Sequence, residues 1–332
     1  MSELIITNGD STVSLLRAAG FETEILPWRD VLHEGPVPET SVSHADDLEQ
    51  LSAIRAAFLA EAFNEPLGTT VHGFEERDRL IRRHAGNSEV TLWFEHDLYD
   101  QLQLLQILAF FHREERSVPL QLVQADDYLG RQTPETIKRF EALKTPISTE
   151  QTALAAALFE AFGKPAPTDL FGFLDQDLSP LPHMRHALLR LFEELPSTRD
   201  GLSRTQQQAL LLIESQGLPS KKLFGAVQAS EDAVFMGDVS FFHCLDELAF
   251  NRSPLIQGLP APFNMSRDDA ERRHYLDADI TLTDVGRAVL AGKADHAEIN
   301  SIDRWLGGTH ITGDGIWRWD RDAMKLVPPT RR

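Results

Sequence analysis

The sequence predicts an α/β fold whose N-terminal part is an open, mainly parallel sheet with helices on both faces. Four short apolar runs, each long enough for a strand, occur before residue 124. Patterns of helical period separate these runs, and right-handed strand–helix–strand crossovers make such strands parallel. After Asp126 the apolar runs stop and helical patterns follow. We therefore expect a helical middle section and a C-terminal domain of another kind.

The first forty residues predict a strand, a helix, a second strand and a long loop. Residues 4–7 form an apolar run, and the helical pattern of 13–19 stops at Gly20. A second strand covers 24–27 and ends with a proline, where a missing N–H does no harm. Residues 28–38 contain a glycine and two prolines, which exclude a regular helix.

Two more strands and three more helices complete the predicted α/β Rossmann-like domain, residues 1–130. The apolar spacing predicts helices over 46–63, 74–85 and 98–112, and strands over 90–94 and 120–123.

The rest of the chain predicts a helical connecting section, 131–200, and a winged-helix-like domain with a C-terminal hairpin, 201–332. Helical patterns cover 133–143, 149–162 and 183–195 in the first, and 203–216, 220–229 and 238–250 in the second. Strand-like residues follow at 255–257 and after Asp279. Two apolar pieces around Thr312-Gly-Asp-Gly315 predict the hairpin.

The composition is that of an ordinary globular protein, with 42% hydrophobic and 25% charged residues in a chain of 332. No apolar run approaches the roughly 20 residues of a membrane helix, and the N-terminus lacks the features of a signal peptide. The single cysteine, Cys244, excludes an internal disulfide and lies in an apolar helical pattern typical of a buried, inert thiol. We expect a cytoplasmic protein.

The formal net charge is −19, and residues 1–130 hold nine Arg, no Lys and 23 Asp or Glu. Such a field repels nucleic acids and anionic membranes over a Debye length of about 8 Å. Its simplest role is to keep the protein in solution, and a cationic ligand or metal ion is the more specific alternative.

The strongest candidate site follows the strand 90–94. Three ionisable residues, Glu95, His96 and Asp97, come directly after it, at the strand end where open α/β sheets bind ligands. Along an extended backbone Glu95 and Asp97 point one way and His96 the other. Glu95 and His96 are costly to bury without a partner or a function, so we assign them as candidate catalytic acid or base.

Helix formation alone explains part of this motif. Asp97 is a suitable N-cap for the next helix, and Asp100 falls in its first turn, where the helix dipole favours an anion. Asp97 and Gln101, one turn further on, are candidate ligand-binding residues that could face the same space.

The loops after the first two strands supply further candidates. Asn8, Gly9, Asp10 and Ser11 form the first βα turn, where many α/β folds bind phosphate, although Asp10 or Ser11 could simply cap the helix. The dinucleotide and P-loop glycine fingerprints are missing. In the second loop the candidates are Asp30, His33 and Glu34. A carboxylate beside an imidazole is a usable acid–base pair, and a loop fixed for structural reasons is the alternative.

Asp10 and His33 are thus candidate catalytic residues together with Glu95 and His96. Asp, Glu and His suit Mg²⁺, Mn²⁺ or Zn²⁺, but no recognised ligand spacing is present, so the metal is unknown and a divalent ion is a weaker alternative.

Arg304 and His310 lie among tryptophans near the C-terminus. They could line a ligand site, with Arg304 balancing the acidic cluster, or form the rim of a tryptophan-rich core hairpin.

The winged-helix pattern does not predict DNA binding. The third helix, 238–250, has three carboxylates, three phenylalanines and no Lys or Arg, whereas major-groove recognition depends on Arg, Lys, Asn and Gln. We expect this domain to pack against protein, with a protein partner or homo-oligomer as candidates.

Four segments together resemble one bacterial family of uncharacterised cytoplasmic proteins with an N-terminal domain of unknown function. They are Asn8-Gly-Asp-Ser11, Trp28-Arg-Asp-Val-Leu-His-Glu-Gly-Pro36, Trp93-Phe-Glu-His-Asp-Leu-Tyr-Asp-Gln-Leu102 and Ile302-Asp-Arg-Trp-Leu-Gly-Gly-Thr-His310. The resemblance implies the domain layout and a bacterial setting, and it implies no reaction, substrate or cofactor.

Three functional hypotheses follow, in this order. The first is an enzyme, a hydrolase or group transferase, acting on a small polar or phosphorylated metabolite at the carboxyl edge of the sheet. The second is a ligand-sensing regulatory or adaptor protein without catalysis. The third is a DNA-binding transcription factor.

Overall fold

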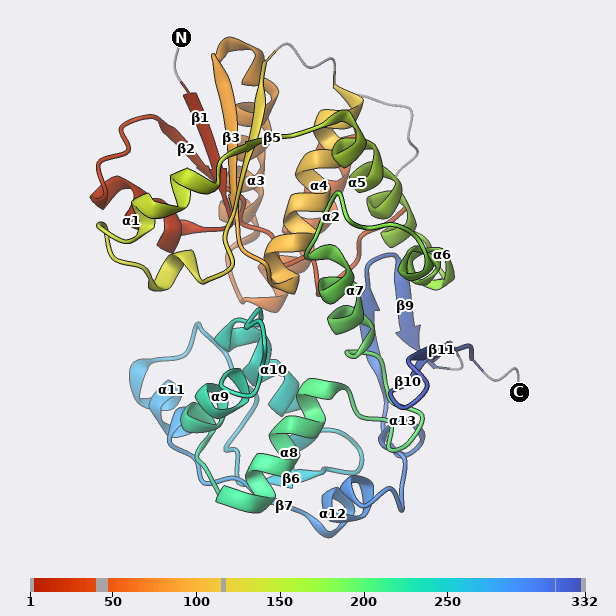
Figure 1. Ribbon diagram of the computed structural model, residues 1–332. Helices are drawn as coiled ribbons and strands as arrows, with labels where there is room; N and C mark the ends of the chain where they lie inside the picture. The colour runs from red at the N-terminus through yellow and green to blue at the C-terminus, as the bar shows by residue number, and fades with distance from the viewer. Residues whose placement is uncertain (1–2, 40–46, 115–117, 314, 330–332) are drawn as a thin grey trace. The chain divides into compact units, whose positions relative to one another are not determined.

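The computed structural model describes residues 3–39, 47–114, 118–313 and 315–329. The chain divides into two units (Figure 1). Unit 1 comprises Met1–Glu61, Pro66–Leu188 and Leu306–Thr309, and unit 2 comprises Ala62–Glu65, Leu189–Trp305 and His310–Arg332. The predicted connecting section, 131–200, is divided between them after Leu188.

Unit 1 contains a five-stranded sheet with the order β2-β1-β3-β4-β5. The strands are β1 Glu3–Thr7, β2 Glu24–Pro27, β3 Glu89–Phe94, β4 Leu120–Gln124 and β5 Thr145–Pro146. The first four pair in parallel, as predicted, and β5 is antiparallel to β4. The expectation that strands end after Asp126 is therefore wrong. A two-residue strand at the sheet edge leaves no apolar run in the sequence, and an edge position tolerates Pro146.

Most helices of unit 1 lie where the apolar spacing predicts them. They are α1 Asp10–Ala18, α2 Asp47–Ala62, α3 Leu67–Arg82, α4 Leu98–Arg113, α5 Thr149–Phe162 and α6 Thr168–Gly172. Short 3₁₀ segments are η1 His84–Gly86, η2 Leu129–Arg131, η3 Ile137–Leu143 and η4 Phe173–Asp175. Two predictions need correction: α3 begins seven residues before position 74, and the helix expected over 133–143 is the 3₁₀ segment η3.

Helices cover both faces of the sheet, as predicted. One face packs on α1, η2 and η3 through a cluster that includes Ile5, Leu16 and Phe140. The other face packs on α4, and Figure 1 shows α4 and α5 together on that side. Because α4 is buried on nearly all sides, its polar residues need partners. Gln106 accepts from Trp28 Nε1 at 2.7 Å, and Gln103 donates to the backbone carbonyl of Asp30 at 2.6 Å.

The strand order creates a topological switch point between β1 and β3. The chain leaves β1 for β2 on one side and then returns across β1 to form β3 on its other side. The connections after β1 and β3 therefore run in opposite directions. The carboxyl ends of these two strands border the crevice where open α/β sheets bind ligands. The turn after β1 begins at Asn8, and the acidic motif begins at Glu95, directly after β3.

Unit 2 has the predicted order of three helices followed by a strand pair. Its elements are α8 Arg204–Gln216, α9 Ser220–Gln228, α10 Asp238–Ala249, β6 Ile256–Gln257, α11 Asp269–Leu276, β7 Thr281–Leu282, α12 Asp284–Leu290 and α13 His296–Ile299. Strands β6 and β7 pair antiparallel around a core that includes Leu210, Phe241 and Leu255. The name winged-helix-like remains a prediction from this order. Cys244, on α10, is only partly buried.

The C-terminal residues form two hairpins, and the single hairpin expected around 312–315 is wrong. Strands β8 Asp303–Leu306 and β9 Thr309–Thr312 pair across Gly307-Gly308, and β10 Arg318–Asp320 pairs with β11 Lys325–Val327. Gly307 has a φ of 59°, the left-handed conformation that a two-residue hairpin turn requires. Residue 314 of the expected turn lies outside the described residues. The hairpin tip, Leu306–Thr309, belongs to unit 1.

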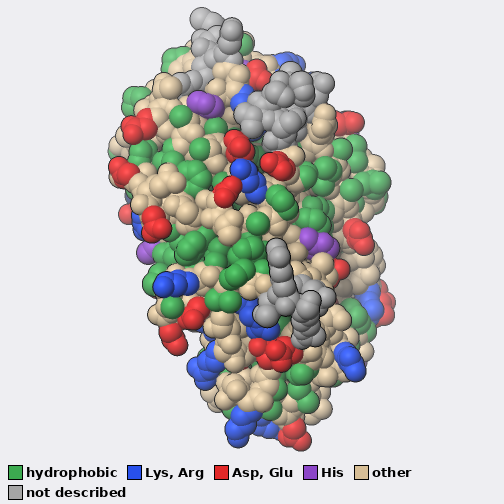
Figure 2. Space-filling view, turned by 90° about the vertical axis from the view of Figure 1, so that its right-hand side faces the viewer, with side chains coloured by type: hydrophobic (Ala, Val, Ile, Leu, Met, Phe, Trp, Pro, Cys, Tyr) green, Lys and Arg blue, Asp and Glu red, His purple; other side chains and the backbone are tan. Residues whose placement is uncertain are grey.

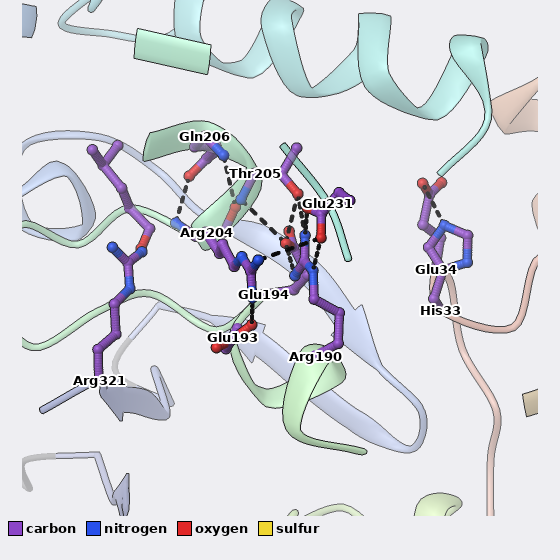
Figure 3. A network of polar contacts seen from close by, with 12 residues as sticks. His33, Glu34, Arg190, Glu193, Glu194, Arg204, Thr205, Gln206, Glu231 and Arg321 are labelled. Carbon is purple, nitrogen blue, oxygen red and sulfur yellow. Dashed lines mark hydrogen bonds and ion pairs between the residues drawn. The ribbon is translucent and has the colours of Figure 1, made fainter. Parts of the chain in front are cut away.

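A buried polar network joins α7, Met184–Phe192, to α8 and the segment after α9 in unit 2 (Figure 3). The Arg190 guanidinium donates to Glu194 at 2.6 Å, to Glu231 at 2.8 and 3.0 Å and to the Thr205 hydroxyl at 2.9 Å. These ion pairs hold the pKa of the buried Glu194 carboxyl below its usual range despite its burial. The network is fully paired, so we assign it a structural role.

Charged side chains of both signs are mixed on the face shown in Figure 2. Among the described residues in that view, Lys and Arg lie scattered between Asp and Glu and form no continuous basic patch. Within the described ranges, none of the helices has the length and apolar composition needed to cross a bilayer.

Candidate functional site

The turn after β1 places the Asn8 side chain at the centre of the sheet edge. The Thr12 hydroxyl, one turn into α1, donates to Asn8 Oδ1 at 3.0 Å and so fixes the orientation of the amide. Asn8 Nδ2 then donates to Asp100 Oδ1 at 2.8 Å and faces Glu95 Oε1 at 3.4 Å. The carboxyl ends of β1 and β3 therefore meet in direct side-chain contact, as the parallel sheet predicts.

Three carboxyl groups gather at the end of β3. Glu95, Asp97 and Asp100 are 5%, 3% and 1% exposed, and an oxygen of each lies within 4.8 Å of the others. Asp97 caps α4, accepting from the Asp100 backbone N–H at 3.2 Å, as predicted. Asp100 turns back and accepts from the Glu95 backbone N–H at 2.5 Å. We call these three residues the acidic triad.

Segments from β4 and α4 close around Glu95. The Leu129 backbone N–H, at the start of η2, donates to Glu95 Oε1 at 2.8 Å. The Gln101 side-chain amide donates to the Glu95 backbone carbonyl at 2.7 Å. Gln101, a candidate ligand-binding residue, thus lies at the site, but this hydrogen bond already occupies its amide nitrogen. Glu95 is therefore held by residues that follow three neighbouring strands.

The electrostatics of the acidic triad are unusual for a group of buried carboxyls. Among the described residues, no Lys or Arg forms an ion pair with Glu95, Asp97 or Asp100. Burial, reinforced by the Asp100 charge, raises the pKa of Glu95 to about 8. Burial and neighbouring carboxylates also raise the pKa values of Asp97 and Asp100. The triad therefore retains protons near neutral pH or binds a cation.

His96 points to a different group of side chains from its two acidic neighbours, as the alternation along an extended backbone predicts. Its ring centroid lies 5.9 Å from that of Tyr128 and 5.8 Å from that of His183. Burial, and then the neighbouring His96, lowers the pKa of His183. His183 precedes α7 and comes from a segment far from β3 in the sequence, so no local pattern could place it here.

The remaining residues of the first turn have other partners. Asp10 is exposed and pairs with Arg29 at 2.6 Å, which lowers the Asp10 pKa. Ser11 is exposed. The expectation that Asp10 or Ser11 caps α1 is wrong, because the helix begins at Asp10 and its N-cap is Gly9, which has no side chain. A Cβ built on Gly9 meets nothing within 4 Å, so the turn is open above the backbone.

The loop after β2 approaches the same edge, but its charged groups are engaged. Asp30 is fully buried and pairs with Arg55 at 2.9 Å, and Arg55 also donates to backbone carbonyls of the loop. His33 is buried beside Glu34 at 3.5 Å, with its ring 6.0 Å from Tyr99 of α4. Asp30 therefore has a structural partner, and His33 reaches α4 one residue away from the acidic triad.

Arg304 and His310 belong to unit 2. Arg304 forms an ion pair with Glu247 at 3.7 Å. His310 Nε2 donates a hydrogen bond to the Asp303 carboxylate at 2.6 Å. The His310 ring also stacks on Trp305, with ring centroids 4.2 Å apart. Their ligand-binding role remains a prediction from the sequence.

Asp100 is the member of the site that the sequence analysis missed. The Asp97-x-x-Asp100 spacing places both carboxyls on the first turn of one helix, and this signal was available. The helix dipole offered a sufficient explanation for Asp100, so its turn back towards Glu95 could not be distinguished from an exposed acidic residue. The backbone donor Leu129 carries no signal in its side chain.

The acidic triad is the one set of His, Cys, Asp or Glu in the described ranges with the spacing of metal ligands. Carboxylate oxygens suit Mg²⁺, Mn²⁺ or Ca²⁺, and burial without a counter-cation is the electrostatic condition that such an ion relieves. A separate cavity of about 460 Å³ lies between α2 and α3, and no triad residue lines it.

Comparison with models of protein families and with curated proteins gives no match.

Proposed function

We propose that this protein is an enzyme, a hydrolase or group transferase that acts on a small polar metabolite at the carboxyl edge of the unit 1 sheet. One observation supports this most strongly. Three buried carboxyl groups lie together at the topological switch point, and no Lys or Arg of the described residues forms an ion pair with them. Such a cluster lowers the stability of the fold, and perturbed groups of this kind concentrate at functional sites.

Glu95 is the residue we propose for proton transfer. A carboxyl group with a pKa near neutrality exchanges protons with a substrate most effectively at physiological pH. Its ionised form removes a proton from an attacking water or hydroxyl, and its neutral form returns a proton to the leaving group. Burial and the Asp100 charge keep its proton affinity high, and Asn8 holds its position.

A divalent cation is the alternative to protons for balancing the acidic triad. Glu95, Asp97 and Asp100 would hold it through one carboxylate oxygen each, and it would supply Lewis-acid chemistry. Dependence of activity on Mg²⁺ or Mn²⁺ and its loss with EDTA separate this alternative from proton transfer alone.

Turnover of generic phosphatase, esterase and nucleotide substrates tests the proposal. We expect Glu95→Gln to reduce turnover by about 10²–10⁴-fold, because a positioned acid or base contributes that much. Glu76→Gln is the matched control, since Glu76 is an exposed residue of α3. Equal turnover by Glu95→Gln and the wild-type protein would show that Glu95 has no catalytic role.

Stabilisation by a metabolite without turnover would favour the alternative, a ligand-sensing regulatory or adaptor protein. The family resemblance and the single cysteine support a bacterial, cytoplasmic setting as part of this proposal.

A further inference from the structure

A second group of side chains lies beside the acidic triad, on the other side of the backbone at residue 96. The His96 ring lies against the rings of Tyr128 and His183, and the Arg131 guanidinium lies over the Tyr128 ring at 4.7 Å. Tyr128 directly precedes Leu129, whose N–H binds Glu95. The short segments 95–96 and 128–131 therefore contribute to both groups, and His183 joins the second group from the segment before α7.

The histidine and arginine side chains of this group leave nitrogen atoms available for a ligand. His96 Nδ1 is buried and has no hydrogen-bond partner among the described residues. Within the described ranges, the His183 ring makes no hydrogen bond and Arg131 makes no ion pair. Leaving a buried donor or acceptor without a partner costs roughly 1–3 kcal/mol, and in this group that cost falls on His96 Nδ1. His183 is partly buried and Arg131 is exposed, so water reaches both of them until a ligand binds.

The nearby acidic residues do not supply the missing acceptor. Asp127 accepts from the Tyr128 backbone N–H at 2.8 Å and from Gln132 at 2.9 Å, and it lies 3.6 Å from Arg139. Asp126 is exposed and acts on His183 only through its charge. The cluster therefore places one guanidinium and two imidazoles close to the acidic triad.

The chemistry of these donors favours an anion over a metal ion. Imidazole binds metals, but a guanidinium in the same cluster repels a cation and cannot lose its proton. Guanidinium and imidazole N–H groups together are suited to the several acceptor oxygens of a phosphate. Stacking on Tyr128 restricts Arg131 to a position in which its donors remain available.

We propose that His96, His183 and Arg131 form a binding site for a phosphate group, so that the substrate of the neighbouring acidic triad is a phosphorylated metabolite. The placement of this group in a substrate rests on the proposed function. The binding of phosphate itself does not.

Titration with inorganic phosphate, followed by NMR of the histidine ring C–H signals, tests the site without any turnover. Sodium chloride at matched ionic strength is the reference. We expect the His96 and His183 signals, assigned by their loss in His96→Leu and His183→Leu, to shift and saturate. The signal of His72, an exposed residue of α3, should not shift.

Loss of one charge-assisted contact should weaken phosphate binding about tenfold or more in Arg131→Met and in His183→Leu. His72→Leu is the matched control and should bind phosphate as the wild type does. Arg131 is exposed, so Arg131→Met keeps the test valid if His183→Leu does not fold.

Unshifted His96 and His183 signals, or unchanged affinity in Arg131→Met, would overturn the phosphate site. Glu95→Gln separates the two proposals, because it should retain phosphate binding while losing turnover. Phosphate binding with normal turnover in Glu95→Gln would remove the proposed role of Glu95 and leave the phosphate site standing.

Discussion

Asp97 has two roles that conflict. Its carboxylate caps α4, which favours the ionised form, and it is buried next to Glu95 and Asp100, which favours the neutral form. The second influence is stronger, and the pKa of Asp97 rises from its usual value of 3.8. Above pH 4 the folded chain therefore keeps a proton that the unfolded chain releases. The stability that this group contributes is lost as the pH rises towards the folded-state pKa.

Asp97→Asn separates these roles, because asparagine caps a helix as well as aspartate does but carries no charge. We expect it to raise the free energy of unfolding by about 1–3 kcal/mol at pH 8 and to change it little at pH 5. Urea unfolding at the two pH values measures the difference. Asp268→Asn is the control, since Asp268 caps α11 but is exposed. Equal destabilisation at both pH values would mean that Asp97 serves only as a cap.

At the residue scale, the sequence indicates which polar side chains helix capping does not account for. It does not indicate which residues those side chains contact. Glu95, His96 and Asn8 were identified because they follow strands, and they do lie at the carboxyl edge. Asp10 follows the same strand, yet it pairs with Arg29 in the loop after β2. Such pairing depends on how loops distant in sequence approach one another, and periodicity carries no information about it.

At the element scale, Arg190 on α7 illustrates the difference between buried and exposed ion pairs. It is 8% exposed and neutralises Glu194 and Glu231 together. Removing one partner of a buried pair leaves an uncompensated charge, whereas an exposed pair contributes little because water already solvates both groups.

Arg190→Met should therefore lower the free energy of unfolding by about 3–5 kcal/mol, and Arg29→Met, at the exposed pair with Asp10, by less than about 1 kcal/mol. Urea unfolding measures both. Adding Glu231→Gln to Arg190→Met should restore part of the loss, because it removes one of the two stranded charges. Similar effects of the two Arg→Met variants would contradict the structural role of the network.

Elements with strong periodicity were predicted, and those defined by tertiary contacts were not. The helix over 149–162 matches α5, which begins with a capping box at Ser148 and Gln151. The first turns of α3 contain Gly68 and Gly73, whose low helix propensity concealed them. Two segments near the C-terminus carry a hairpin-turn signal, Gly307-Gly308 and Thr312-Gly-Asp-Gly315. Two adjacent glycines favour a hairpin turn as strongly as the second segment does, so local sequence does not identify the correct turn.

At the scale of the whole molecule, the C-terminal hairpin tip completes unit 1. Gly308 N donates to the Phe162 carbonyl at 2.8 Å, the Thr309 hydroxyl donates to Lys164 O at 3.2 Å, and Gly307 O accepts from Val37 N at 2.9 Å. A Cβ on Gly308 would collide with the Gly163 carbonyl. The tip thus fits against backbone, which cannot move aside as a side chain could.

Gly308→Ala should consequently lower the free energy of unfolding of unit 1 by about 1–3 kcal/mol, through overpacking. Hydrogen exchange at the backbone amides of β1 and β3 follows the unfolding of unit 1. Gly73→Ala is the matched control: with open space around it within α3, it should raise stability by about 0.5–1 kcal/mol. A neutral Gly308→Ala would show that the tip is dispensable to unit 1.

The return of residues 306–309 to unit 1 also imposes an order of events on biosynthesis. Leu306 leaves the ribosome 118 residues after Leu188, the last residue of the preceding unit 1 segment. At a synthesis rate of roughly 5–20 residues per second, about 6–24 s pass between the synthesis of Leu188 and that of Leu306. Unit 1 lacks the hairpin tip for that time. During that interval the Phe162 and Lys164 carbonyls lack the donors that later bind them. A ribosome stalled within unit 2 would leave unit 1 in this incomplete form.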